Sequence, residues 1–477
     1  MKNRTNGSSS GKPPVEPLRH DLGAEKAAST DGYARRLVKE HGPIIVIGPD
    51  WRQWQPNTEG GGIWRSIDKD KFLGLAYDIQ AGNKSNKAAI NVVDSMRMIC
   101  QKSNPENFEW RGAIGFKNEH IVIINVLNGV VRVDLEKFTI ELIEADPSHY
   151  ATAQLPLRYN PEAKCEVFDK ILSTTLPDAA NRLKIQCFIG YCFLPDTRHQ
   201  CVLHCYGRAH SGKSLLIEHA IGSMFGKQLM SLVSLAAICD GKDELRALEG
   251  SLLNVGDEID ERELKNSAIF NKLACCEELD AALKYDRTRR IRPACKFIYI
   301  GNHLPRWHKG SEAQARRIKI LEFDQNFKGQ PEDDKLKRAV MKEHSGIFNW
   351  ALRGLIELIK LGVMPVGSIG SQKRQQEFVE GNDPMRAFVD KYIIFDRKAV
   401  RALTSTEFEK GYRRWADNNG YQISEYQGGP VGIFCKLYSI KKRQLRDKGQ
   451  RHRYLLGVRM DWKILFEVVT EDVTNLL

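Results

Sequence analysis

The feature that most constrains the fold of this chain is a glycine-bracketed loop between an apolar run and an amphipathic segment. The loop consists of Gly207, Arg208, Ala209, His210, Ser211, Gly212, Lys213 and Ser214. Residues 201–206 (CVLHCY), before the loop, are short and largely apolar, as a buried parallel strand should be. Residues 215–225 carry an apolar stripe at helical spacing, and Gly226 suits the end of a helix. The order strand, loop and helix predicts an α/β fold with a parallel sheet.

The residue types of this loop suit a bound triphosphate. Its two glycines let backbone N–H groups close around phosphate oxygens, and a helix that follows would point its positive end at them. Lys213 can reach the β- and γ-phosphates, and the Ser214 hydroxyl can ligate Mg²⁺. A chance match in a basic loop is the alternative, but the flanking strand and helix favour a site for ATP with Mg²⁺, contacted by all eight residues.

Polar residues follow the next two apolar runs of the chain. Asp257 and Glu258 come directly after residues 252–256 (LLNVG). We expect Asp257 to bind Mg²⁺ through water and Glu258 to polarise the attacking water, although a solvated strand end is the alternative. Asn302 ends the run 296–301 (KFIYIG). Its amide can orient the water or sense the γ-phosphate, or it can cap a turn.

A pair of arginines, Arg316 and Arg317, precedes a further strand at residues 318–323. A guanidinium that reaches a nucleotide held by a neighbouring subunit would stabilise the charge of the transition state. A basic strand edge is the alternative for one of the two, and the sequence does not show which one acts.

The charge of the chain favours a polyanionic partner such as nucleic acid. The net charge is +12 and the pI is about 9.1. Six Lys or Arg stand against one Asp in residues 281–300, and eight against one Asp in residues 441–460. Two concentrated basic segments are harder to explain as an evenly solvated surface.

The composition is that of a soluble globular protein, with 42% hydrophobic and 28% charged residues. No apolar run approaches the ~20 residues that cross a bilayer, and the first residues show no secretory signal. We therefore expect a cytoplasmic protein without a membrane partner. A cluster of cysteines lies at Cys187, Cys192, Cys201 and Cys205, near His199 and His204. Its spacing lacks the CxxC pairs of zinc sites, which favours reduced, buried thiols.

The pattern along the chain predicts four parts. Residues 1–30 are expected to be a flexible tail and residues 31–160 a smaller α+β domain. Residues 161–365 hold the motifs above behind a helical lead-in, and residues 372–477 form a further small domain. A Gly-, Pro- and Ser-rich stretch at residues 362–371 is typical of a linker.

Two features stand out in the smaller domain. Asn128 and Gly129, between two apolar runs, predict a β-hairpin. Three tryptophans, Trp51, Trp54 and Trp64, favour a small core over a surface that stacks nucleobases.

The order of these motifs resembles the superfamily 3 helicases, and most closely the helicase part of phage and plasmid primase-helicases and their poxvirus relatives. The resemblance covers most of residues 110–365 and rests on GRAHSGKS, LLNVGDEID, FIYIGNHLP and ARRIKILEF. It implies an AAA+-like P-loop ATPase core, preceded by the smaller domain and followed by a winged-helix-like domain that binds DNA. It also implies a replicative DNA helicase of a phage, plasmid or other mobile element. Such a helicase is a homo-oligomer, a hexameric ring, which moves 3′-to-5′ on single-stranded and forked DNA.

The same resemblance implies that a hairpin between the acid pair and Asn302 enters the pore of the ring. Lys284 matches the pore lysine of the family, with Tyr285 beside it and Arg287 and Arg289 following. A cation at such a tip would contact DNA phosphates without regard to sequence, and an exposed basic turn is the alternative.

Other functions fit parts of this pattern. An initiator or loader would use ATP as an assembly switch and would not unwind DNA processively. A small-molecule kinase would have a P-loop but no use for two basic segments. We see no paired metal-binding carboxylates of a primase before residue 160, so we expect primer synthesis to belong to a separate primase or other replication protein.

Overall fold

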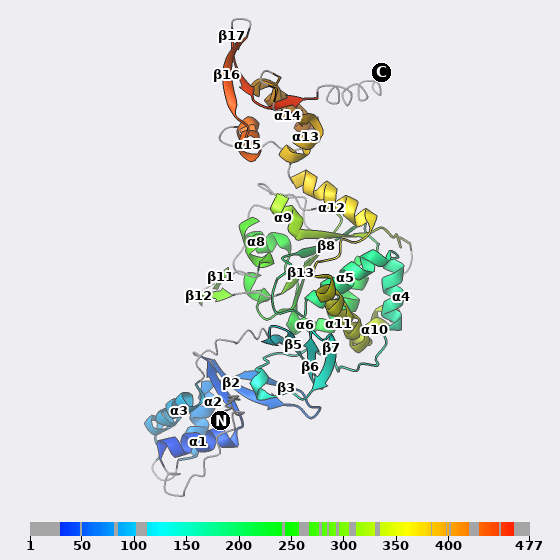
Figure 1. Ribbon diagram of the computed structural model, residues 1–477. Coiled ribbons are helices and arrows are strands. Elements are labelled where there is room, and N and C mark those ends of the chain that lie inside the picture. The colour runs from blue at the N-terminus through cyan, green and yellow to red at the C-terminus, as the bar shows by residue number, and fades with distance from the viewer. Residues whose placement is uncertain are drawn as a thin grey trace, which may run out of the picture. The chain divides into compact units, whose positions relative to one another are not determined.

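A parallel β-sheet in the larger of two units organises the fold (Figure 1). The first unit takes its residues from Met1–Pro56, Gly62–Phe108 and Asp146–Tyr150, and the second from Asn57–Gly61, Glu109–Ala145 and Ala151–Leu477. This computed structural model describes residues 29–47, 50–80, 84–101, 112–240, 244–256, 267–275, 279–283, 286–291, 295–304, 312–329, 334–382, 384–396, 398–399, 402–418, 429–447 and 450–461. Of the helices in these segments, none combines the length and the apolar character that a bilayer crossing needs.

The smaller unit packs helices on a three-stranded antiparallel sheet with the order β1-β2-β3. Its elements are α1 (Thr30–Glu40), β1 (Ile44–Ile47), β2 (Asp50–Pro56), β3 (Gly62–Ile67), α2 (Lys69–Asp78), α3 (Asn86–Cys100) and η2 (Pro147–His149). Trp51, Trp54 and Trp64 are each less than 10% exposed. The indole nitrogen of Trp64 donates to the carbonyl oxygen of Pro147 at 2.9 Å. All three are thus buried, as a core role predicts: Trp51 belongs to the core cluster of this unit, and Trp54 packs against Trp64.

The larger unit begins with an antiparallel sheet of four strands in sequence order. The strands are β4 (Ile114–Asn118), β5 (Ile121–Val126), β6 (Gly129–Asp134) and β7 (Thr139–Ile143). The predicted hairpin is confirmed, but its turn lies one residue earlier than expected, because Val126 pairs with Gly129. Asn128 is held in the turn by the backbone of Tyr159, to which its amide nitrogen donates at 2.9 Å and from which its amide oxygen accepts at 2.8 Å.

The central sheet has five strands in the order β14-β8-β13-β10-β9, and every pair is parallel. The strands are β8 (Val202–Gly207), β9 (Met230–Ser231), β10 (Leu253–Gly256), β13 (Lys296–Gly301) and β14 (Ile318–Phe323). Successive side chains of β13 enter different cores: Phe297 and Tyr299 join one, and Ile298 and Ile300 join the other. Both faces of the sheet are therefore covered, which is the reason its strands read as continuous apolar runs. The prediction of an α/β fold with a parallel sheet is confirmed.

Helices cover both faces of this sheet. The described helical elements of this part are α4 (Glu166–Thr175), α5 (Ala179–Tyr191), η3 (Leu215–Gly222), α6 (Ser223–Leu229), α7 (Leu235–Asp240), η4 (Glu244–Leu248), α8 (Ser267–Ala274), α9 (Glu312–Arg317), α10 (Asp334–Val340), α11 (His344–Leu361) and α12 (Ile369–Asn382). Side chains of α4, α5, η3, α6 and α11 fill one core, and side chains of α7, η4, α8 and α12 contribute to the other. The helical path after the loop breaks at Gly226, which has φ 68°, as the sequence indicated.

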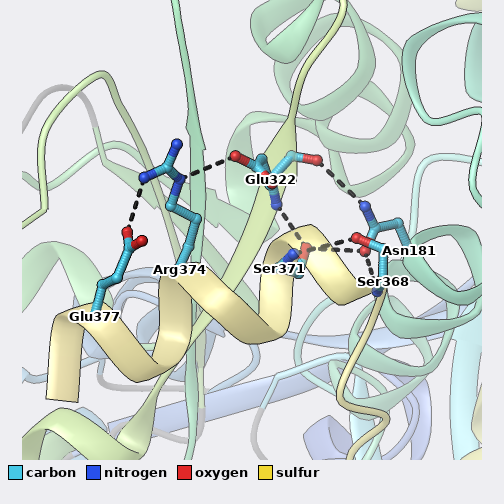
Figure 2. Close-up of polar contacts among 6 residues, drawn as sticks. All are labelled: Asn181, Glu322, Ser368, Ser371, Arg374 and Glu377. Carbon is cyan, nitrogen blue, oxygen red and sulfur yellow. Dashed lines mark hydrogen bonds and ion pairs between the residues drawn. The ribbon is translucent and has the colours of Figure 1, made fainter. Parts of the chain in front are cut away.

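The outer edge of β14 is capped by side chains (Figure 2). Asn181 of α5 donates from Nδ2 to the carbonyl oxygen of Glu322 at 3.3 Å, and the Ser371 hydroxyl of α12 accepts from the Glu322 N–H at 3.0 Å. Two residues earlier, Lys184 donates to the Ile320 carbonyl at 2.7 Å. The backbone N–H and C=O groups of an edge strand need hydrogen-bond partners. On β14, these side chains supply partners that a sixth strand would otherwise provide.

The last part of the larger unit builds its own aromatic core from Phe388, Phe408, Tyr412, Trp415 and Phe434. Its elements are α13 (Pro384–Tyr392), β15 (Ile393–Phe395), α14 (Ser405–Asn418), α15 (Gly429–Leu437), β16 (Lys442–Asp447), β17 (Gln450–Leu455) and β18 (Val458–Met460). β15 pairs with β18 and β16 with β17, both antiparallel.

Candidate functional site

The central sheet places the glycine loop beside the residue that follows β13. β8 and β13 pair in parallel, with Gly301 opposite Tyr206. Parallel neighbours end at the same edge of a sheet, which is where ligands bind in open α/β folds. The loop and Asn302 therefore begin from adjacent strand ends.

The backbone of the loop has a shape that suits anions. His210 has φ 61° and Gly212 has φ 84°, both left-handed. Left-handed residues between right-handed ones turn successive N–H groups into a shared concavity. A Cβ on Gly212 would lie 2.5 Å from Cγ2 of Thr175, and one on Gly207 would lie 2.3 Å from the carbonyl oxygen of Phe323. Both glycines of the motif are therefore required by close packing.

The Lys213 ammonium lies among oxygen atoms and is only 7% exposed. Its Nζ donates to the carbonyl oxygens of Gly207 and Arg208, each at 2.7 Å, and to the Ser211 hydroxyl at 3.2 Å. It also lies 3.3 Å from Oδ1 of Asn302, which is 89 residues away in the chain. A charge this deeply buried needs such oxygens. Two residues that the sequence analysis assigned separately to the γ-phosphate are thus in contact.

Four residues of the loop are exposed: Arg208, Ala209, His210 and Ser214. The His210 carbonyl accepts a hydrogen bond from the N–H of Phe327, just beyond β14, at 2.8 Å. Ser214 stands at the start of η3, so its hydroxyl is accessible at the amino end of a helix. An oxygen in that position can bind a cation or donate to a phosphate.

Several predicted site residues lie outside the described residues: Asp257, Glu258, Lys284 and Tyr285. β10 ends at Gly256, directly before the acid pair, and pairs with β13. The chain therefore leaves β10 at the edge of the sheet where the loop lies. The hairpin expected between the acid pair and Asn302 is confirmed as an antiparallel pairing of β11 (Leu279–Leu283) with β12 (Asp286–Ile291). Arg287 and Arg289 belong to β12.

The two arginines form the last turn of α9, immediately before β14. Arg317 is half-buried and donates from Nη1 to Oδ1 of Asn271 on α8. Arg316 is exposed. The two guanidinium groups therefore differ in exposure.

The four clustered cysteines are buried free thiols. Burial raises the pKa of each, those of Cys187, Cys192, Cys201 and Cys205, to about 12. Among the residues that the structure describes, no group of three or more His, Cys, Asp or Glu side chains is arranged to hold a metal ion. These thiols stay protonated and pack as small apolar groups.

The β16–β17 hairpin gathers exposed cations at the end of the chain: Lys442, Arg443, Arg446, Arg451 and Arg453. Arg446 stands directly opposite Arg451. Like charges in such a pair repel each other. A bound anion would reduce this electrostatic repulsion. Part of the basic segment that the sequence shows at residues 441–460 thus forms an antiparallel hairpin.

Two features of the site were not singled out from the sequence. His204 of β8, considered there only with the cysteines, contacts the turn after Asn302. The guanidinium of Arg374 on α12 lies 5.6 Å from the ring centre of Tyr206, the residue before the loop. Its Nε lies 3.1 Å from a carboxylate oxygen of Glu322 (Figure 2). A lone imidazole in an apolar strand was a signal for His204; nothing in the sequence linked Arg374 to Tyr206.

Comparison with known proteins adds a family match and distant structural likenesses. A model described as "Family of unknown function (DUF5906)" matches residues 205–317, which run from β8 through the loop, β10 and β13 to Arg317. Among curated proteins, none matches this chain. A solved apo structure of the NrS-1 C-terminal region (305–718) in its A form is 13% identical, with a TM-score of 0.47, covering 90% of this chain and 99% of that chain. A second A-form apo structure of that region is 12% identical, with a TM-score of 0.45 and coverages of 89% and 98%. At these values, the likeness does not by itself establish a shared fold.

Proposed function

We propose that the loop at residues 207–214 binds ATP and that the chain hydrolyses it. The observation that carries this proposal is the contact of Lys213 with Asn302 across adjacent parallel strands. The Lys213 ammonium would contact the β- and γ-phosphates, and the Asn302 amide would contact the attacking water or the γ-phosphate. The loop carbonyls that Lys213 contacts are weaker partners for an ammonium than phosphate oxygens are.

Mg²⁺ is the cofactor that this chemistry requires. The exposed Ser214 hydroxyl at the start of η3 fits one ligand position, and Asp257, directly after β10, would hold the ion through water. When bound, Mg²⁺ neutralises phosphate charge. Glu258 would accept the proton of the attacking water, and Asn302 would orient it.

We further propose that hydrolysis drives movement on DNA, as in a replicative helicase of a phage, plasmid or other mobile element. The net charge of +12 and the exposed cations of β16–β17 support a nucleic-acid partner. Lys284 and Tyr285, between β11 and β12, would grip one strand, with Arg287 and Arg289 nearby. Arg316 or Arg317 would complete the site of a neighbouring copy, and a ring of identical subunits would provide this contact at every site.

The test begins with steady-state ATPase activity in the presence and absence of single-stranded DNA. Lys213→Ala should lower DNA-stimulated turnover about 100-fold or more, because transition-state charge loses its cation. Lys227→Ala, an exposed lysine on α6, is the matched control and should retain parent turnover. Parent turnover in Lys213→Ala would refute the ATPase proposal.

Strand displacement on a forked duplex separates the helicase from an ATP-switched initiator or loader. The helicase proposal predicts displacement that depends on ATP hydrolysis and on a free single-stranded arm. Binding of the fork that responds to ATP, without displacement at any enzyme concentration, would favour the initiator. ATPase activity that ignores DNA would favour a small-molecule kinase or similar enzyme.

A further inference from the structure

His204 connects the strand before the loop to the turn after β13. It lies on β8, three residues before Gly207, and its side chain is fully buried. Its Nε2 lies 2.9 Å from the carbonyl oxygen of His303, the residue after Asn302. A carbonyl oxygen only accepts, so Nε2 carries the hydrogen and donates it.

The second ring nitrogen of His204, Nδ1, carries a hydrogen only if the imidazole is charged. Burial, the largest effect, and the positive charge of Lys213 together lower the pKa of His204 to about 4, against the opposing effect of the His303 carbonyl. The ring is therefore neutral at physiological pH, and Nδ1 has no hydrogen. Among the described residues, Nδ1 has no hydrogen-bond partner although it is buried.

A histidine in this position is costly for stability. An apolar side chain would avoid the unsatisfied Nδ1 but would leave the His303 carbonyl without this donor. The ring is also held closely by packing, because a Cβ on Gly301 would lie 3.2 Å from its Cε1. What the imidazole supplies, and an apolar residue cannot, is the fixed link to the turn that carries Asn302.

We propose that His204 is a positioning residue for Asn302 in ATP hydrolysis, an inference that rests on the proposed function. By holding the His303 carbonyl, it keeps the Asn302 amide beside Lys213, where Oδ1 and Nζ are 3.3 Å apart. A turn free to move would misplace the amide relative to the γ-phosphate, and small misplacements strongly slow chemistry. Nucleotide affinity comes mainly from the loop and should change little.

Three substitutions at His204 test this link, because they change whether the side chain has an N–H donor and how far that donor lies from the backbone. His204→Gln places an amide N–H about where Nε2 lies, His204→Asn carries the same group on a shorter side chain, and His204→Leu has no donor. We expect the Leu and Asn variants to lose about 10-fold in kcat, with the Kd for a non-hydrolysable ATP analogue within about 3-fold of the parent value. The Gln variant should recover most of the loss. Thermal unfolding followed by circular dichroism checks that each variant is folded.

A double substitution separates positioning from general destabilisation. In an Asn302→Ala background, His204→Leu should lower kcat no further, because its effect passes through the missing amide. A loss of equal size in both backgrounds would overturn the inference. So would parent kcat in His204→Leu, or a histidine ¹⁵N spectrum that shows His204 protonated on Nδ1 at pH 7. A parent protein that binds ATP but never hydrolyses it would instead overturn the proposed function itself.

Discussion

Replacing Lys184 by Met is expected to remove a pH-dependent part of the stability of the central sheet. Lys184 lies on α5, is 1% exposed, and donates from Nζ to the carbonyl oxygens of Ile320 at 2.7 Å and Val366 at 3.0 Å. It links the edge of β14 to the segment before α12. Met has a similar length but neither charge nor donor, so the substitution removes the titrating group with little change in packing.

The size of the effect follows from the pKa of this lysine. Burial, and secondarily the positive charge of Lys319, lower it from 10.5 to about 8. The folded protein therefore binds fewer protons than the unfolded chain between those values, and the free energy of unfolding rises as pH increases through this window. At 1.36 kcal/mol per pKa unit, the rise is about 3 kcal/mol in total and about 2 kcal/mol between pH 7.5 and pH 9.5.

Urea unfolding of the parent and Lys184→Met proteins at a series of pH values measures this term. The buried thiols, whose pKa values are raised to about 12, favour the unfolded state as pH increases. Lys184 lowers the pKa of Cys201 and Cys205, but all four thiols stay protonated in the folded state of both proteins up to pH 9.5, so their contribution cancels in the difference. We expect the difference in unfolding free energy to change by about 2 kcal/mol over this range in favour of the parent. Lys227→Met, at an exposed position on α6, controls for the loss of a lysine as such. Parallel profiles for the parent and Lys184→Met would refute the reasoning.

Three further predictions concern other parts of the larger unit. Asn181→Ala should lower the free energy of unfolding by about 3 kcal/mol, since its amide makes three hydrogen bonds to Glu322, Ser368 and Ser371 (Figure 2); an unchanged urea midpoint would contradict this. The pair Arg451→Glu and Arg453→Glu should weaken duplex DNA binding and reduce the slope of log affinity against log salt by about 0.9 for each lost phosphate contact, which fluorescence anisotropy at several salt concentrations measures. Lys284→Ala should spare basal ATPase activity but cripple unwinding of a fork, and normal unwinding would remove its role in the pore.

The glycine loop was predictable because its information is local. The apolar run, the loop and the stripe of the following helix are contiguous, and each has a period or a residue type tied to one structure. The same holds for the β5–β6 hairpin and for the burial of Trp51, Trp54 and Trp64. The one-residue shift of the hairpin turn was not predictable, because the partner that holds Asn128 is the backbone of Tyr159, a contact between distant residues.

The composition of residues 362–371 suggested a linker, and the structure shows contacts that composition does not reveal. The Val366 carbonyl accepts from Lys184, and the fully buried Ser371 donates to Asn181. These partners are 182 and 190 residues away in the chain. Small and polar residues suit a flexible linker, but they also suit a close cover on the edge of a sheet, and a residue type alone does not separate the two uses.

The sequence alone determined that a glycine-bracketed loop follows a buried strand and precedes a helix, because residues next to each other in the chain specify that geometry. It also supplied Asn302 as a candidate site residue, because this polar residue follows a strand. Only the tertiary structure decided that β13 is the neighbour of β8, that Asn302 contacts Lys213, and that His204 contacts the turn after Asn302. Strand order is set by how helices cover both faces of the sheet, and that depends on packing between residues far apart in the chain.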